Sequence, residues 1–186
     1  MSKKIIEGDV EISSLHIKVI PDFLSDVEIK GKLLCAHNKL ISLKGCPKSV
    51  ANDFNCNFNY LTTLEGAPQS VGGNFACAKN KLKTLKGCPK SVNDFNCNFN
   101  YLTTLEGAPQ SVRGNFYCDY NQLTTLQGAP QSVGGDFICR GNQITTLEGA
   151  PQSVGRNFVF QGNKVKFTAK QIRAVCDVKG KIYFRT

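Results

Sequence analysis

The sequence has no tryptophan, one methionine and two histidines among 186 residues, and it has no long apolar run. A membrane helix needs roughly 18 consecutive apolar residues, so we expect no membrane span. The N-terminus reaches Glu7 and Asp9 before any apolar stretch as long as that of a signal peptide. These absences predict a cytoplasmic protein.

Sequence motifs for catalysis and metal binding are also missing. No Gly-x-Gly-x-x-Gly or Walker-type loop opens a helix, no Cys-x-x-Cys pair occurs, and the two histidines are His16 and His37. A catalytic site needs a nucleophile or base beside an orienting partner, and a structural zinc site needs four cysteine or histidine ligands. We therefore predict no catalytic residue, no metal site and no cofactor, and the chain is not expected to be an enzyme.

What the sequence does contain is a repeat of the form Phe-x-Cys-x-x-Asn-x-Leu-x-x-Leu-x-Gly-x-Pro-x-Ser-Val. Successive copies are 21, 21, 20, 21 and 21 residues apart, and a seventh, degraded copy keeps Asn163. The block 52–71 is identical to 93–112, which indicates a tandem duplication. The equivalent cysteines are Cys35, Cys56, Cys77, Cys97, Cys118 and Cys139, and the equivalent asparagines are Asn38, Asn59, Asn80, Asn100, Asn121 and Asn142.

The repeat predicts a helix-free solenoid. Phe54 and Cys56 alternate with Asn55 and Asn57, as in a strand with one buried face. About twenty residues leave no room for a crossover helix, so each coil should give one short strand, and coils about 4.8 Å apart should form a parallel sheet. The repeat cysteines should fill the core in reduced form. The asparagines should bond to backbone groups of their own and adjacent coils.

The segment Phe54-x-Cys56-x-x-Asn59-x-Leu61 resembles the hallmark of leucine-rich repeats. The helix-free length, with Pro-x-Ser-Val before the next strand, is similar to the short repeats of YopM and IpaH type bacterial effectors. Only 19 residues follow residue 167, so the ubiquitin-ligase activity of IpaH-type effectors is not carried over. The segment Leu-Glu-Gly-Ala-Pro-Gln-Ser-Val-Gly-Gly also resembles repeat proteins of large tailed phages. The resemblance to leucine-rich repeats implies a protein partner. If the protein is encoded by a phage, the resemblance implies that this partner is a host protein in the host cytoplasm.

We expect a β-rich solenoid of leucine-rich-repeat coils that form a curved parallel sheet with a cap at each end. Residues 1–30 should be a β cap, with strands over 10–12 and 15–19 and an irregular entry through 24–29. Residues 31–167 should hold roughly six and a half repeats. Residues 168–176 should form an amphipathic helix with Thr168 as N-cap and an apolar face of Ala169, Ile172, Val175 and Cys176. A strand through Ile182 and Phe184 should complete a helix-strand cap over 168–186.

The outward columns of the sheet supply the candidate binding residues. Core packing does not require aromatic side chains there, and aromatic residues beside charged ones resemble a protein-binding hot spot. The alternative interpretation is scattered surface aromatics. The candidate partner-binding residues are Phe58, Lys79, Phe99, Tyr117, Asp119, Tyr120 and Arg140.

The basic C-terminal end supports a second hypothesis. Residues 51–160 carry 8 basic and 7 acidic side chains, whereas residues 161–186 carry 7 and 1. Such a cluster could bind a nucleic-acid backbone, or it could be a solvated cap that keeps the solenoid soluble. The candidate nucleic-acid-binding residues are Lys170, Arg173, Lys179, Lys181 and Arg185.

Overall fold

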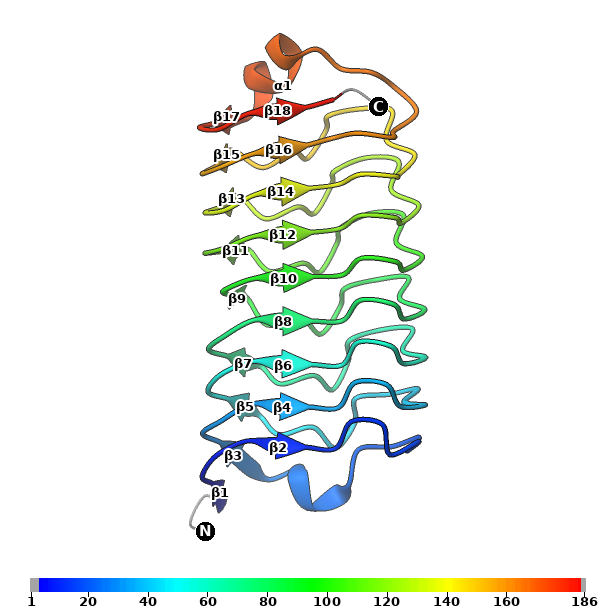
Figure 1. The fold of residues 1–186 in the computed structure, drawn as a ribbon, viewed down its shortest axis with the longest axis vertical. Helices are drawn as coiled ribbons and strands as arrows, with labels where there is room; N and C mark the ends of the chain where they lie inside the picture. Colours follow the sequence, from blue (N-terminus) through cyan, green and yellow to red (C-terminus); the bar gives the residue numbers. More distant parts are fainter. Residues whose placement is uncertain (1–3, 185–186) are drawn as a thin grey trace.

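The chain folds into a stack of coils that is built around one large parallel sheet. The computed structural model describes residues 4–184, and in it nine coils each add one strand to this sheet in sequence order (Figure 1). The predicted β-rich solenoid is confirmed. The strands of the large sheet are β2 (Val10–Glu11), β4 (Leu33–Leu34), β6 (Phe54–Asn55), β8 (Phe75–Ala76), β10 (Phe95–Asn96), β12 (Phe116–Tyr117), β14 (Phe137–Ile138), β16 (Phe158–Val159) and β18 (Ile182–Tyr183).

The expectation of one strand per coil is wrong, because the Ser-Val pair of each repeat forms a second strand. These strands pair in parallel with serine opposite serine and valine opposite valine, and each valine is buried. They form two further sheets, of four and five strands. The first contains β1 (Lys4–Ile6), β3 (Val27–Ile29), β5 (Ser49–Val50) and β7 (Ser70–Val71), and the second contains β9 (Ser91–Val92), β11 (Ser111–Val112), β13 (Ser132–Val133), β15 (Ser153–Val154) and β17 (Asp177–Val178).

Columns of identical side chains fill the core between the sheets. Six phenylalanines from Phe54 to Phe158 stack on one another with ring centroids 5.0 to 5.6 Å apart. The six repeat cysteines are buried and free, as predicted. In Cys56 and Cys77, for example, burial raises the pKa of the thiol well above its usual value of 9.0. The neutral thiol is therefore the stable form in the folded protein.

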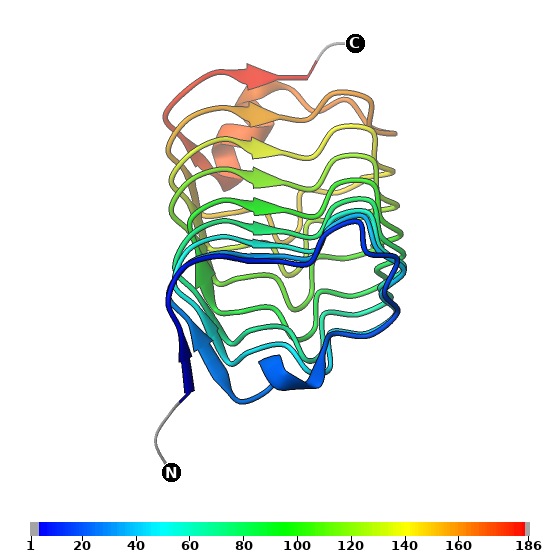
Figure 2. The ribbon, with the colours of Figure 1, turned by 60° about the horizontal axis from the view of Figure 1, so that its bottom comes forward.

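The asparagines link adjacent coils at the corner where each strand ends. Asn80 donates through Nδ2 to the carbonyl oxygens of Cys56 and Cys77, at 3.0 and 3.1 Å, and its Oδ1 accepts from the backbone N–H of Leu61 at 3.1 Å. The predicted role of the asparagines is confirmed. These bonds hold the corner loops of successive coils above one another. Figure 2 shows the aligned loops along the stack, with the N-terminal coil in front.

The N-terminal segment is a full coil of the stack. Residues 10–11 and 27–29 are strands in register with the next coil, and a 3-10 helix, η1 (Asp22–Leu24), lies between them. The expected strand over 15–19 is not formed, and Leu15 and Val19 are exposed. The predicted irregular entry was wrong at Val27–Ile29, because Val27 and Ile29 face the core like the Ser-Val pairs of later coils.

The C-terminal cap contains the predicted helix, α1 (Ala169–Val175). The Thr168 hydroxyl accepts a hydrogen bond from the Gln171 backbone N–H, and the Gln171 side chain accepts one from the Thr168 backbone N–H. Together the two bonds form a capping box. Only Ile172 of the helix is buried, and Val175 is 50% exposed, contrary to the expected apolar face. No helix within residues 4–184 is long and apolar enough to cross a membrane.

Candidate functional site

The residue before each asparagine adopts the left-handed backbone conformation. In five successive coils this residue is His37, Phe58, Lys79, Phe99 or Tyr120, with φ between 53° and 55°. The following two coils use Gly141 and Gly162 there. A side chain other than glycine costs about 1 kcal/mol in this region, and strained residues of this kind cluster at functional sites. Five coils therefore keep large side chains where glycine would be easier to accommodate.

These five side chains stack into one continuous column, which we call the aromatic ladder. The rings of His37 and Phe58 are 4.1 Å apart, and those of Phe99 and Tyr120 are 4.7 Å apart. Between the two pairs, the Lys79 ammonium lies 4.6 Å from the Phe58 centroid and 5.4 Å from the Phe99 centroid. The ladder ends over Gly141, where a Cβ atom would lie 2.6 Å from the Tyr120 ring. The two ring pairs are thus joined through the Lys79 ammonium, and Phe58, Phe99 and Tyr120 remain 40 to 50% exposed.

A second column runs on the other side of the asparagines, and we call it the tyrosine–lysine row. It consists of the exposed residues Lys39, Tyr60, Lys81 and Tyr101. The Lys81 ammonium lies 4.9 Å from the centroid of the Tyr60 ring. The aromatic ladder and the tyrosine–lysine row together form a surface that we call the ridge. Beside it, Lys83, Tyr101, Thr103 and Gln122 line a hollow of about 360 Å³.

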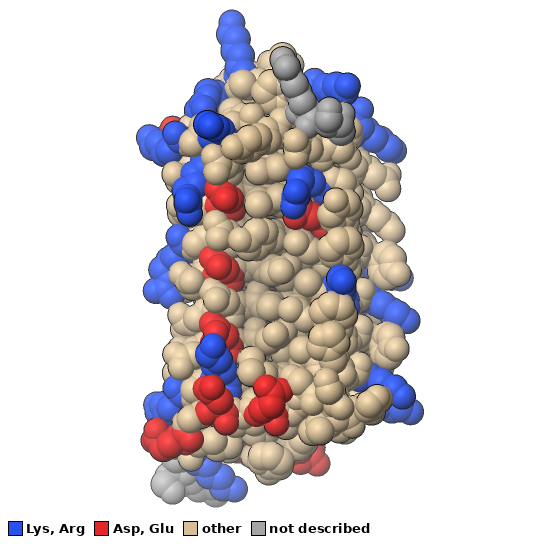
Figure 3. Space-filling model, in the orientation of Figure 1, with Lys and Arg blue, Asp and Glu red and all other residues tan. Residues whose placement is uncertain are grey.

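The ridge belongs to a belt of positive charge. His16 has the same left-handed backbone conformation in the preceding coil, with φ of 58°, so eight coils contain this position. The five residues that begin at this position contain, over the eight coils, seven lysines, no arginine and no acid. The acidic residues all lie outside this belt, and Figure 3 shows many of them near the starts of the large-sheet strands. There, Asp53 and Asp94 accept backbone N–H bonds from the next coil. The lysines of the belt are Lys18, Lys39, Lys79, Lys81, Lys83, Lys164 and Lys166.

The structure brings together four of the seven candidate partner-binding residues, namely Phe58, Lys79, Phe99 and Tyr120. Tyr117 lies apart on β12 and is half-buried, which together with the nearby acids Asp94 and Asp136 raises its pKa. Asp119 was expected to point outward, but it is 1% exposed and accepts from the backbone N–H of Arg140 at 2.8 Å. The strand has already ended at Tyr117, so the alternation that predicted an outward Asp119 no longer applies.

Two of the candidate basic residues of the C-terminal cap have intramolecular partners. The Arg173 guanidinium donates to the carbonyl oxygens of Val178 and Gly180, and Lys179 lies 2.8 Å from Asp177. Lys170 and Lys181 are exposed. Arg185 lies outside the described residues.

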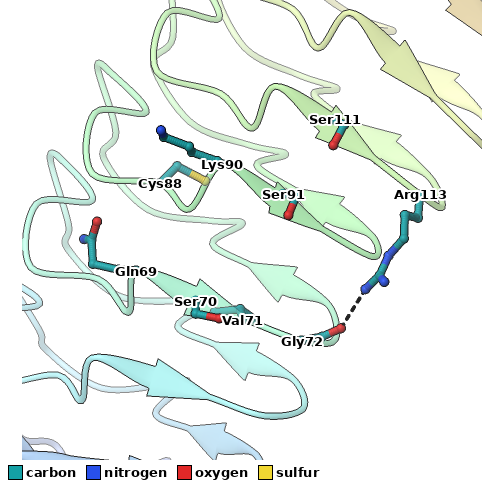
Figure 4. A pocket seen from close by; sticks show the side chains of 9 residues that line it. All are labelled: Gln69, Ser70, Val71, Gly72, Cys88, Lys90, Ser91, Ser111 and Arg113. Carbon is teal, nitrogen blue, oxygen red and sulfur yellow. Dashed lines mark hydrogen bonds between the residues drawn. The ribbon is translucent and has the colours of Figure 1, made fainter.

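A separate hollow marks the one repeat of 20 residues. The two smaller sheets divide between β7 and β9, at the coil whose link from Val92 to Phe95 is one residue shorter than the corresponding link from Val71 to Phe75. The hollow has a volume of about 640 Å³, and the Arg113 guanidinium crosses it to donate to the Gly72 carbonyl at 2.9 Å (Figure 4). Lys90 points away from Arg113 in this view. The two cations therefore do not converge on a common anion site.

Sequence reasoning missed Tyr60, Lys81 and Tyr101. A signal was present, because the column after the asparagine reads Lys39, Tyr60, Lys81, Tyr101. The outward columns that supply the predicted binding residues all precede the asparagine. Among the described residues, no group of three or more histidine, cysteine or acidic side chains is placed to hold a metal ion.

The strain in the ladder predicts that Tyr120→Gly is tolerated. Glycine removes about 1 kcal/mol of backbone strain and loses a stacking contact of about the same size, so the free energy of unfolding should change by no more than about 1 kcal/mol. Chemical denaturation would measure it. Tyr117→Gly, in a strand and half-buried, should cost about 2 kcal/mol or more. Equal losses in the two variants would contradict the assignment of strain.

Comparison with solved structures agrees with this geometry. The chain has the leucine-rich-repeat fold. It is similar to the leucine-rich-repeat domain of a Shigella effector, with a TM-score of 0.69 and 19% sequence identity over 93% of this chain and 81% of that chain. No family matches the sequence, and no curated protein matches it. The short-repeat fold implied by the sequence resemblance is confirmed.

Proposed function

We propose that this protein is a non-enzymatic scaffold that binds a partner protein through the ridge. The observation that carries the proposal is the aromatic ladder, in which large side chains occupy left-handed positions and remain exposed. Folding alone does not require them, because Gly141 and Gly162 serve in the same column. Exposed aromatic residues beside charged ones are typical of binding hot spots.

The fold supports a binding role over catalysis. A solenoid presents columns of side chains over an extended surface, and the thiols have raised pKa values because they are buried, which opposes nucleophilic activity. One structurally similar chain is the leucine-rich-repeat domain of a Shigella effector. We therefore propose, as the finer form of this function, an effector-type or phage-type protein that inhibits or redirects a host protein in the host cytoplasm.

Nucleic-acid binding through the C-terminal cap is the second candidate. Its support is the cluster of seven basic residues in 161–186. The intramolecular bonds of Arg173 and Lys179 weaken it, because these side chains would have to exchange partners on binding.

Affinity capture from host-cell extract tests the proposal. The double variant Phe99→Gly/Tyr120→Gly should lose at least tenfold of partner recovery, which corresponds to about 1.4 kcal/mol. The matched control Lys170→Gln/Lys181→Gln removes two exposed side chains from the C-terminal cap and should keep full recovery. Loss of binding in the control alone, together with nuclease-sensitive recovery, would favour nucleic acid and contradict the proposal.

A further inference from the structure

We infer that the partner contacts the ridge with an acidic, extended segment of polypeptide. This inference rests on the proposed function and adds the chemistry of the partner. Its first support is charge: the belt holds seven lysines and no acid, although the whole chain has 14 acidic residues. The lysines lie in four of the eight coils, and three of them, Lys79, Lys81 and Lys83, lie in one coil at the middle of the aromatic ladder. The charge of the belt is therefore positive wherever it is charged, and it would attract an acidic partner.

The second support is the way the aromatic rings are used. Phe58 lies between His37 and Lys79, and Phe99 lies between Lys79 and Tyr120. A nucleic-acid base binds aromatic residues by stacking on an open ring face, and both faces of the Phe58 and Phe99 rings are already in contact with neighbours in the ladder. The exposed ring edges carry partial positive charge. They suit carboxylate and carbonyl oxygens, so the geometry favours polypeptide over a single-stranded nucleic acid.

The hollow beside the ridge offers a place for one acidic side chain. Its lining provides the Lys83 ammonium, the Tyr101 and Thr103 hydroxyls and the Gln122 amide. All four side chains are exposed, and each can donate a hydrogen bond to a carboxylate. The belt contains no arginine, the residue whose planar fork suits bidentate phosphate binding.

The repeat spacing sets the length of the segment. The aromatic ladder spans four coil spacings of about 4.8 Å, and an extended chain advances about 3.3 Å per residue. A segment of about six residues would therefore run along the ladder. Lys79, Lys81 and Lys83 lie in the middle coil of this path, so acidic residues near the centre of the segment should contribute most.

The test uses the purified protein and three fluorescent probes of equal length: a glutamate-rich peptide, the same peptide with glutamine for glutamate, and oligothymidylate. The glutamate peptide should bind the wild type at low salt, and the glutamine peptide at least tenfold more weakly. The triple variant Lys79→Gln/Lys81→Gln/Lys83→Gln should weaken glutamate-peptide binding at least tenfold. The control Lys170→Gln/Lys179→Gln/Lys181→Gln removes equal charge from the C-terminal cap and should leave binding within about twofold.

Three results would overturn the inference: no binding of the glutamate peptide, an equal effect of the two triple variants, or ridge-dependent binding of oligothymidylate in its place. Failure here is distinguishable from failure of the proposed function. If the glutamate peptide does not bind but Phe99→Gly/Tyr120→Gly still abolishes capture of a protein partner, the ridge binds protein and the inferred chemistry of the partner is wrong.

Discussion

Raising the pH from about 8 to about 10 should unfold this protein, because the folded state holds its cysteines as neutral thiols. Burial raises the pKa of the six repeat cysteines from the ordinary value of 9.0. Their stabilising effect is complete below pH 9.0 and is lost as the pH rises above it, since only the unfolded chain releases these protons. Above pH 9.0, each cysteine lowers the free energy of unfolding by about 1.4 kcal/mol per pH unit.

Burial also raises the pKa of the Cys46, Cys88 and Cys176 thiols. All nine cysteines together therefore lower the free energy of unfolding by about 12 kcal/mol per pH unit, and a domain has only about 5–15 kcal/mol in total. Urea denaturation in the presence of a reductant at a series of pH values measures this slope. In the variant Cys77→Val/Cys97→Val the slope should fall by about a fifth, and Ile12 in the same column shows that an aliphatic side chain fits there. A flat profile through pH 10 would contradict protonated, buried thiols.

The second large effect is expected from neighbouring asparagines. Asn80 and Asn100 both donate to the carbonyl oxygen of Cys77, at 3.1 Å each. After either single change to alanine, that carbonyl still has one donor. However, Asn80→Ala leaves the buried backbone N–H of Leu61 without an acceptor, and Asn100→Ala does the same to Leu82. Each single variant should therefore lose about 2–3 kcal/mol, the cost of an unpaired buried group.

The double variant Asn80→Ala/Asn100→Ala removes both donors from Cys77 and should lose about 1–3 kcal/mol more than the sum of the single changes. Asn59 and Asn100 occupy identical coils and share no carbonyl acceptor, so their double variant should be additive. Denaturant midpoints of the six proteins complete both cycles. Coupling of equal size in the two pairs would contradict the described bonding.

The repeat was enough to predict the coils, the inward cysteines and the bridging asparagines, because each depends only on what recurs at a fixed offset. The second strand was missed, since Ser70–Val71 is two residues long and has no alternation to detect. Val175 was expected inside because of its spacing in the helix, yet it is 50% exposed because α1 covers the end of the stack with little more than Ile172.

The site was less predictable than the fold, because it depends on residues that meet only after the chain has coiled. Phe99 and Tyr120 are 21 positions apart and stack at 4.7 Å. A sum of charges along the sequence makes residues 51–160 almost neutral. In the fold, Lys79, Lys81 and Lys83 lie on the belt without acids, whereas Asp53 and Asp94 bond at the starts of the strands.

Site-specific photo-crosslinking tests the central claim most directly. A photoreactive aromatic amino acid in place of Tyr101 on the ridge should give a covalent adduct with one partner in cell extract, and the adduct should resist nuclease and be digested by protease. The same amino acid in place of Ser132, which is exposed on β13 away from the ridge, should give none. Adducts from position 132 alone, or nuclease-sensitive adducts at position 101, would contradict binding of a protein partner through the ridge.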